Sequence, residues 1–356
     1  MTQLEVFQAT VDHRKVEKPL FYADFTQDLL RRVRQFCDIP QGTGTRDFFG
    51  MFRPADVSPY EPSQAATRYD LLEPYYTGCS QYDPARVNCL GVLEVPGSLY
   101  HFTRIVSPLR NAEELSEIER YPFPTHEGCA LVDLSAVVAA AHDQGKVVSC
   151  WSGHLYENSW QIRGYESFLV DMLLNPENCD FIFDRISEFN LETAVAAAKA
   201  GVDLLSTGDD VANQRDLMFS IEVWRRFIKP RWAKLYAEVK KINPRIKIRY
   251  HSDGNIMSII PELIEIGVDI LNPVQPECLD VREVKRKYGD KLVLDGAIGT
   301  QSVMPFGTPE DVRQAVRAAR RDLGSDGALI LAPTHVLEPE VPIENILAFV
   351  AACLED

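Results

Sequence analysis

From about residue 129 to the C-terminus, short apolar runs rich in valine, isoleucine and leucine alternate with longer amphipathic stretches. This alternation is typical of a parallel sheet whose strands are separated by helices and covered on both faces. The sequence therefore predicts the α/β class. The expected strands are VVSCW (147–151), DLLST (203–207), IKIRYH (246–251), DILNP (269–273), LVLDG (292–296) and ALILAP (328–333).

Helices are expected between these strands. Ser220 and the segment Thr308-Pro309-Glu310-Asp311 look like helix starts, because a capping residue, an early proline and early carboxylates favour a helix N-terminus. An earlier strand, PLFYADF (19–25), precedes the helix-like segment QDLLRRVRQF (27–36). The other helices are expected at Ser220–Lys240, Ser258–Ile266, Asp280–Tyr288 and Pro309–Leu323.

The region from about 40 to 128 is polar, aromatic and proline-containing, and it interrupts the alternation. We interpret it as an elaboration that walls the mouth of a barrel, with a β-rich piece around Val87–Val106, inside a single domain spanning 1–356. Periodicity alone fits either a closed eight-stranded (β/α)8 barrel or an open doubly wound sheet. The lack of a GxGxxG turn after the first strand weakens a dinucleotide-binding version of the open sheet.

The charge balance restricts the partners. With 37 basic and 52 acidic residues, the net charge of −15 opposes nucleic acid or an anionic membrane as the main partner, and favours a small molecule or another protein. The N-terminus lacks an apolar core and a cleavage site, so a cytoplasmic location is expected. The eight cysteines form no CxxC pair and are expected to be reduced and mostly buried.

Three long stretches resemble the uroporphyrinogen decarboxylase superfamily: GDDVANQRDLMFSIEVWRRFIKPRWAKL (208–235), YHSDGNIMSIIPELIEIGVDILNPVQPE (250–277) and LDGAIGTQSVMPFGTPEDV (294–312). The resemblance implies a (β/α)8 TIM barrel with its active site at the carboxyl ends of the strands. It also implies one of two chemistries, cofactor-free decarboxylation of a porphyrinogen or zinc-dependent methyl transfer involving a corrinoid protein. The decarboxylase signature Arg-Gln-Ala-Gly-Arg-Tyr is replaced here by ADFTQDLLRR (23–32), so the chain is more similar to the methyltransferase-like members.

His251 and Asp253 lie two residues apart at the end of an expected strand, so both side chains can leave the same edge of the sheet, and Gly254 lets the chain turn. The methyltransferases have a His-x-Cys pair and a distant Cys as zinc ligands. By position, Asp253 and His335 stand where those thiolates stand. The resemblance therefore implies a Zn²⁺ or iron site formed by His251, Asp253 and His335, with an open coordination position. The alternative is a hydrogen-bonded pair that orients substrate without metal.

On this interpretation the metal is a Lewis acid that stabilises the anion left when a methyl group departs from a small methoxylated or methylated substrate. The methyl group would pass to a corrinoid carried by a separate protein, because the sequence has no Asp-x-His-x-x-Gly signature. Two alternatives stay open: a cofactor-free decarboxylase or lyase, and a non-catalytic partner subunit. The family's decarboxylases are dimers, but the sequence leaves the choice between a monomer and a homodimer open.

Further site residues are expected at strand ends, where polar groups of barrels meet substrate. Carboxylates could act as general base or orient substrate, although Asp210 could instead cap the next turn. Aromatic residues after the 147–151 strand could wall a flat ligand, although such residues are more often core. The catalytic candidates are Asp24, Glu157, Asp209 and Asp210, and the substrate-binding candidates are Trp151, His154, Tyr156, Trp160, Gln275 and Asp295.

Overall fold

The computed structural model describes residues 1–61, 69–95 and 104–355. Its centre is a parallel sheet in which neighbouring strands follow the order β1-β6-β7-β8-β9-β10-β11. Strands β6 to β11 confirm the six expected strands, and β6 runs on to His154 instead of ending at Trp151. The bounds are β1 Ala55–Asp56, β6 Val148–His154, β7 Leu204–Gly208, β8 Lys247–His251, β9 Ile270–Val274, β10 Val293–Ile298 and β11 Leu329–Pro333.

The expected first strand, 19–25, closes this sheet. On one side Tyr22 N donates to Leu331 O at 3.0 Å, and Leu331 N donates to Leu20 O at 2.9 Å. On the other side Phe52 N donates to Phe21 O at 2.7 Å, just before β1 begins. The segment forms only isolated bridges, Phe21 to Leu331 in β11 and Phe25 to Leu337 beyond β11, yet it takes the eighth place in the ring. The expected (β/α)8 TIM barrel is therefore confirmed, and the open doubly wound alternative is wrong.

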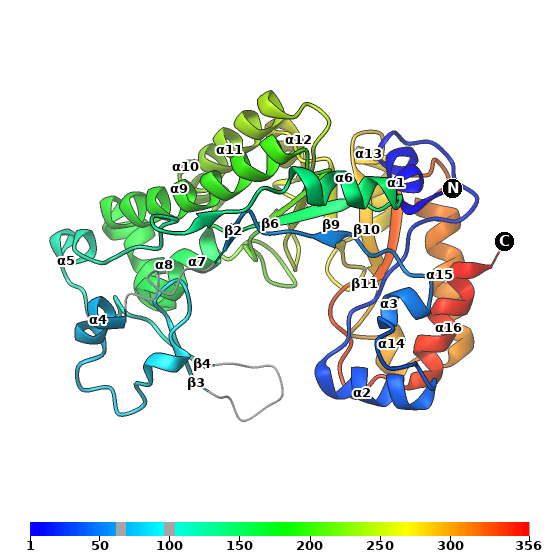
Figure 1. The fold of residues 1–356 in the computed structure, drawn as a ribbon, viewed down its shortest axis with the longest axis horizontal. Helices are drawn as coiled ribbons and strands as arrows, with labels where there is room; N and C mark the ends of the chain where they lie inside the picture. The colour runs from blue at the N-terminus through cyan, green and yellow to red at the C-terminus, as the bar shows by residue number, and fades with distance from the viewer. Residues whose placement is uncertain (62–68, 96–103, 356) are drawn as a thin grey trace.

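Helices cover the outside of the barrel, with α9, α11 and α12 along one flank and α15 and α16 along another (Figure 1). The expected helix Ser220–Lys240 is divided at Ile228, because Pro230 lies in the first turn of a new helix and cannot continue the previous one. Ser220 and Thr308 cap their helices through bonds from Val223 N and Asp311 N. The bounds are α2 Gln27–Phe36, α9 Pro176–Ala200, α10 Ile221–Phe227, α11 Lys229–Ile242, α12 Ile260–Ile266, α13 Val281–Tyr288, α15 Pro309–Leu323 and α16 Ile343–Leu354.

The region before β6 forms a separate set of short elements. Its described part contains two antiparallel pairs, β2 with β5 and β3 with β4, and the expected β-rich piece contains the second pair, with residues 96–103 outside the described ranges. In Figure 1, α4, β3 and β4 lie at the opposite end of the molecule from α2 and α16. The bounds are β2 Tyr60–Glu61, α4 Tyr69–Leu72, η2 Glu73–Tyr76, η3 Pro84–Arg86, β3 Leu93–Val95, β4 Arg104–Val106, α5 Leu115–Glu119, β5 Ala130–Leu131 and α6 Ser135–Asp143.

In Figure 1, α7 and α8 lie below α9, whereas α14 lies near α16; these and two others are the remaining helices. They are α1 Gln3–Val11, α3 Thr45–Phe48, α7 Tyr156–Arg163, α8 Tyr165–Leu174 and α14 Val303–Phe306. Among the described residues, no helix is long and apolar enough to cross a membrane.

All eight cysteines are free thiols, but only Cys150, Cys179 and Cys353 are buried. The expectation that most would be buried is wrong. Cys79, Cys89 and Cys129 belong to the region before β6, where Cys89 is exposed and the other two are half-buried.

Candidate active site

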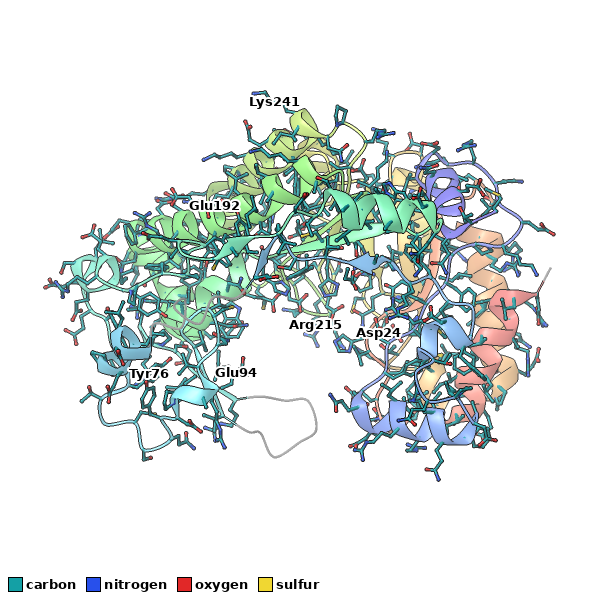
Figure 2. All side chains as sticks on the ribbon, viewed as in Figure 1. Asp24, Tyr76, Glu94, Glu192, Arg215 and Lys241 are labelled. Atoms are coloured by element: carbon teal, nitrogen blue, oxygen red, sulfur yellow. The ribbon has the colours of Figure 1, made fainter. Side chains whose placement is uncertain are left out.

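A cavity of about 410 Å³ lies within the barrel and opens at the carboxyl ends of its strands. We call it the barrel cavity. Figure 2 shows Asp24, near the end of the 19–25 segment, on the same edge of the barrel as Arg215, which follows β7. Polar groups from most strands reach the wall. The lining includes Tyr22, Asp24, Arg46, Asp56, Ser149, Ser206, Arg249, His251, Asn272, Asp295, Thr334 and His335.

Three potential metal ligands meet beside this cavity. Asp210, His251 and Asp253 each offer one ligand atom, and these atoms all lie within 4.8 Å of one another. Asp210 follows β7, and β7 pairs with β8 so that Gly208 lies opposite His251. Asp253 N donates to Asp210 Oδ1 at 2.8 Å, and His251 Nε2 lies 3.7 Å from the same oxygen. We call these residues the Asp-His-Asp group.

One carboxylate oxygen of the Asp-His-Asp group is buried without a partner. Asp253 Oδ1 is buried and has no hydrogen-bond partner. Burial raises the pKa of Asp253, the His251 charge lowers it, and the neighbouring Asp210 raises it further. A buried carboxylate oxygen without a partner is unfavourable, and a divalent cation would satisfy it. One imidazole and two carboxylates are acceptable ligands for Zn²⁺ and for iron, so the residues fit a metal.

His335 does not belong to the Asp-His-Asp group. Its ring is exposed, and Nδ1 lies 3.4 Å from the backbone oxygen of Val336. The physical reason is the strand order: β9 and β10 separate β11 from β8, whereas β7 is the direct neighbour of β8. Asp210, and not His335, is the residue whose ligand atom lies within 4.8 Å of those of His251 and Asp253. His335 still lines the barrel cavity, and its charge lowers the pKa of Asp253.

Asp209, expected as a general base, follows β7 and is fully buried against the first residues of α7. Its Oδ1 accepts hydrogen bonds from Leu155 N at 2.7 Å and Tyr156 N at 2.5 Å, and its Oδ2 accepts one from Trp232 Nε1 at 3.1 Å. Burial raises the pKa of Asp209 to about 7, although the His154 charge and the Trp232 bond lower it. Both oxygens accept hydrogen bonds, Oδ1 from the start of α7 and Oδ2 from α11, so this buried carboxylate ties the two helices together.

His154 and Glu157 form an ion pair next to the Asp-His-Asp group. His154 Nδ1 lies 2.6 Å from Glu157 Oε2, and Asp210 N donates to the same oxygen at 3.3 Å. Burial alone lowers the pKa of His154, but the bond to Glu157 and the charges of Glu157 and Asp209 raise it to about 9. The pKa of Glu157 is lowered, because the His154 interactions outweigh burial, which raises it. His154 is therefore a cation at neutral pH.

The lining of the barrel cavity includes none of the expected aromatic residues Trp151, Tyr156 and Trp160. Tyr156 is fully buried and its ring packs against Phe168 and Phe219, so it belongs to the core and cannot reach a ligand. The sequence-based expectation for Tyr156 is therefore wrong. Trp160 packs on Tyr165, and Trp151 is 45% exposed with its edge on His154. Gln275 is buried, and its Oε1 accepts a bond from Gly254 N at 3.4 Å.

Sequence reasoning missed several residues on the wall of the barrel cavity. Arg249 Nε donates to Asp295 Oδ2 at 2.7 Å, which places the expected Asp295 in an ion pair. Arg46 forms an ion pair with the expected Asp24, with 2.5 Å between Arg46 Nη2 and Asp24 Oδ1. Arg249 could have been found, because it lies two residues before His251 in one strand and must share its face. Tyr22 and Asn272 also lie on this wall, and their proximity to Arg249 and His251 becomes visible only when the strands are placed side by side.

Comparisons with known proteins identify the family. Residues 152–355 match the family described as uroporphyrinogen decarboxylase (URO-D). Methylcobamide:CoM methyltransferase MtaA of Methanosarcina barkeri is 29% identical over 175 residues, 48% of each chain, so the match spans about half the length of this relative. A uroporphyrinogen decarboxylase of Actinobacillus succinogenes is 23% identical over 338 residues, 89% of each chain.

Among solved structures, a methyltransferase from Methanosarcina mazei superimposes with a TM-score of 0.67 at 17% sequence identity, covering 99% of this chain and 98% of that one. This likeness concerns the fold. The superfamily resemblance noted from the three long stretches is thus confirmed by the family match, which covers more than half of the sequence. The chain belongs to the uroporphyrinogen decarboxylase (URO-D) family.

Proposed function

We propose that this protein is a methyltransferase that moves a methyl group from a small methoxylated or methylated compound to the cobalt of a corrinoid carried by a separate protein. The observation that carries the proposal is the Asp-His-Asp group beside the barrel cavity, with Asp253 Oδ1 buried and unpartnered. Sequence similarity to a relative named as a methylcobamide:CoM methyltransferase supports it.

Asp210, His251 and Asp253 would hold the metal, for which we propose Zn²⁺. When bound, Zn²⁺ supplies Lewis-acid stabilisation of negative charge on the heteroatom that loses its methyl group. In the reaction the bond between that heteroatom and the methyl carbon breaks, and a bond from the carbon to cob(I)alamin cobalt forms, with both electrons supplied by cobalt. The released heteroatom then takes up a proton from water at the open mouth of the barrel.

The protein's own contribution is binding and orientation. The barrel cavity of about 410 Å³ is large enough for a small organic substrate. Thr334 and Asn272 offer neutral polar contacts on its wall, while Phe52 and Ile330 offer apolar ones. The ion pair of His154 with Glu157 holds the start of α7 next to Asp210 and so fixes one side of the Asp-His-Asp group.

The test uses the purified full chain, Zn²⁺ and free cob(I)alamin prepared by chemical reduction. Methoxylated aromatics, methanol, methylamines and methyl thioethers are offered in turn, and the cobalt absorption spectrum reports formation of methylcobalamin. We expect one class of donor to methylate cobalt in a protein-dependent manner, and Asp253→Asn to abolish it. Methylation at equal rates with the wild type and with Asp253→Asn would contradict the proposal.

A cofactor-free decarboxylase is the second candidate, favoured by the Asp24 carboxylate on the wall of the barrel cavity and its pairing with Arg46. The full-length match to a uroporphyrinogen decarboxylase supports this alternative. Release of carbon dioxide from a carboxylated substrate without cobalamin, unaffected by Asp253→Asn but lost in Asp24→Asn, would favour it over methyl transfer.

A further inference from the structure

The wall of the barrel cavity contains an unbroken chain of hydrogen bonds that ends at His251. His251 Nδ1 lies 2.7 Å from Asn272 Oδ1, and Asn272 Nδ2 donates to the Tyr22 hydroxyl at 3.3 Å. The Tyr22 hydroxyl donates to Asp295 Oδ1 at 3.0 Å and accepts a bond from Arg249 Nη2 at 2.7 Å. Three neighbouring strands, β8, β9 and β10, and the 19–25 segment supply these residues.

The Arg249–Asp295 ion pair, at the end of this hydrogen-bond chain opposite His251, fixes which group donates in every bond of the chain. A guanidinium can only donate, and the Asp295 carboxylate paired with it can only accept. Burial raises the pKa of Tyr22 well above its usual value, more than the Arg249 charge lowers it, so the hydroxyl keeps its proton. That proton goes to Asp295, and the hydroxyl oxygen is left to accept from Arg249 and from Asn272.

The Asn272 amide carries these donor and acceptor assignments on to the His251 imidazole. Because the Tyr22 oxygen accepts, the amide NH₂ faces Tyr22 and the amide oxygen faces His251. An amide oxygen has no proton to give, so the proton between the two residues belongs to His251 Nδ1. The neutral imidazole then carries its lone pair on Nε2, the nitrogen 3.7 Å from Asp210 Oδ1.

The residues of this hydrogen-bond chain are also held in place. Asn272 is 5% exposed and Asp295 is 1% exposed, so neither exchanges its partners freely with water. Asn272 lies opposite His251 in the register of β8 and β9, and its backbone oxygen accepts a bond from Ser252 N at 2.8 Å. The sheet therefore fixes the backbone of Asn272 beside His251, and the bonds to His251 and Tyr22 hold its side-chain amide.

We infer that Asn272 and Tyr22 are positioning residues that hold the proton of His251 on Nδ1 and present Nε2 to Asp210 and Asp253. The consequence for metal binding rests on the proposed function, whereas the tautomer is a property of the metal-free protein. Outer partners of metal-binding histidines commonly fix the tautomer in this way, and their loss lowers metal affinity about 10- to 100-fold.

The first experiment measures the tautomer itself in metal-free, ¹⁵N-histidine-labelled protein by long-range ¹⁵N–¹H correlation spectra. The His251 resonance is assigned with His251→Gln. We expect the Nδ1–H form in the wild type at a pH where His251 is neutral, and a mixture of forms in Asn272→Leu. An Nε2–H form in the wild type, or an unchanged tautomer in Asn272→Leu, would overturn the inference.

The second experiment tests whether Tyr22 acts through Asn272. In Asn272→Asp either carboxylate oxygen can accept from Nδ1–H, so orientation no longer depends on Tyr22. Tyr22→Phe should reduce the Nδ1–H fraction in the wild-type background and have no effect on it in the Asn272→Asp background. An equal effect of Tyr22→Phe in both backgrounds would show that Tyr22 acts by another route, and would overturn this part of the inference.

The third experiment measures Zn²⁺ affinity by competition with a chelator. Asn272→Leu should bind Zn²⁺ about 10- to 100-fold more weakly than the wild type, with Asn272→Asp close to the wild type. Thr207→Val is the matched control, because Thr207 is also buried on a neighbouring strand but bonds to Tyr236 on the helix side. Equal affinity in Asn272→Leu and the wild type would overturn the inference. If the wild type binds no Zn²⁺, the proposed function loses its metal. The tautomer experiment would still decide whether Asn272 positions the His251 proton.

Discussion

The two carboxylates of consecutive positions 209 and 210 illustrate how residue environment decides a role. Asp209 is buried and holds the start of α7, while Asp210 reaches the Asp-His-Asp group. The sequence presents them as an equivalent pair, and it could predict that both follow a strand. It could not assign their roles, because these depend on which neighbouring strand or helix each side chain faces.

At the residue scale, Asp253→Asn should stabilise the metal-free protein at neutral pH. Burial raises the pKa of Asp253 in the folded state, so its ionisation opposes folding as pH rises above the ordinary value. The neutral amide removes this effect. Thermal unfolding of metal-free protein should therefore show a higher Tm for Asp253→Asn at pH 7, and the difference should fade toward pH 4. A lower Tm for Asp253→Asn at pH 7 would contradict the conclusion that the Asp253 carboxylate is buried without a partner.

Also at this scale, Glu157→Gln should return the pKa of His154 toward its ordinary value. The Glu157 interactions help to raise the pKa of His154 to about 9. A raised folded-state pKa stabilises the protein fully below the unfolded value near 6.5, and this stability is lost as pH rises through about 9. Glu157→Gln should remove the decline in unfolding free energy between these pH values, measured by urea unfolding. A decline identical to that of the wild type would show that Glu157 does not hold the charge of His154.

At the element scale, the strands could be predicted because each is a local apolar run. Helix starts such as Thr308 could be predicted from capping chemistry. The division at Ile228 could have been inferred from Pro230. The contact of Asp210 with His251 could not be predicted, because it depends on β7 and β8 being adjacent in the sheet. The position of His335 outside this group could not be predicted for the same reason.

The cap of α15 gives a prediction at this scale. Thr308 Oγ1 accepts a bond from Asp311 N at 3.2 Å, and the Asp311 side chain accepts one in return from Thr308 N at 2.8 Å. Thr308→Ala should lower the free energy of unfolding by about 1 kcal/mol, as loss of a helix N-cap generally does. Thr308→Ser keeps the hydroxyl and should stay near the wild type in denaturant unfolding. Equal losses in both variants would show that the hydroxyl is not the stabilising group.

At the scale of the whole molecule, the barrel was predictable because alternation of strand and helix repeats along the sequence. Its closure was not, because segment 19–25 forms isolated bridges to Leu331 in β11 and to Leu337 just after β11, at the other end of the sequence. The polar chain from Arg249 to His251 was hidden for the same reason: its members come from four segments that meet only in the closed barrel.

The central claim is that Asp210, His251 and Asp253 together hold a catalytic metal at the mouth of this barrel. Metal content of purified, Zn²⁺-loaded and dialysed protein tests it most directly, with Asp210→Asn and His335→Ala compared with the wild type. We predict about one Zn²⁺ per chain in the wild type and in His335→Ala, and little or none in Asp210→Asn. A wild type without bound metal, or metal lost in His335→Ala but retained in Asp210→Asn, would contradict it.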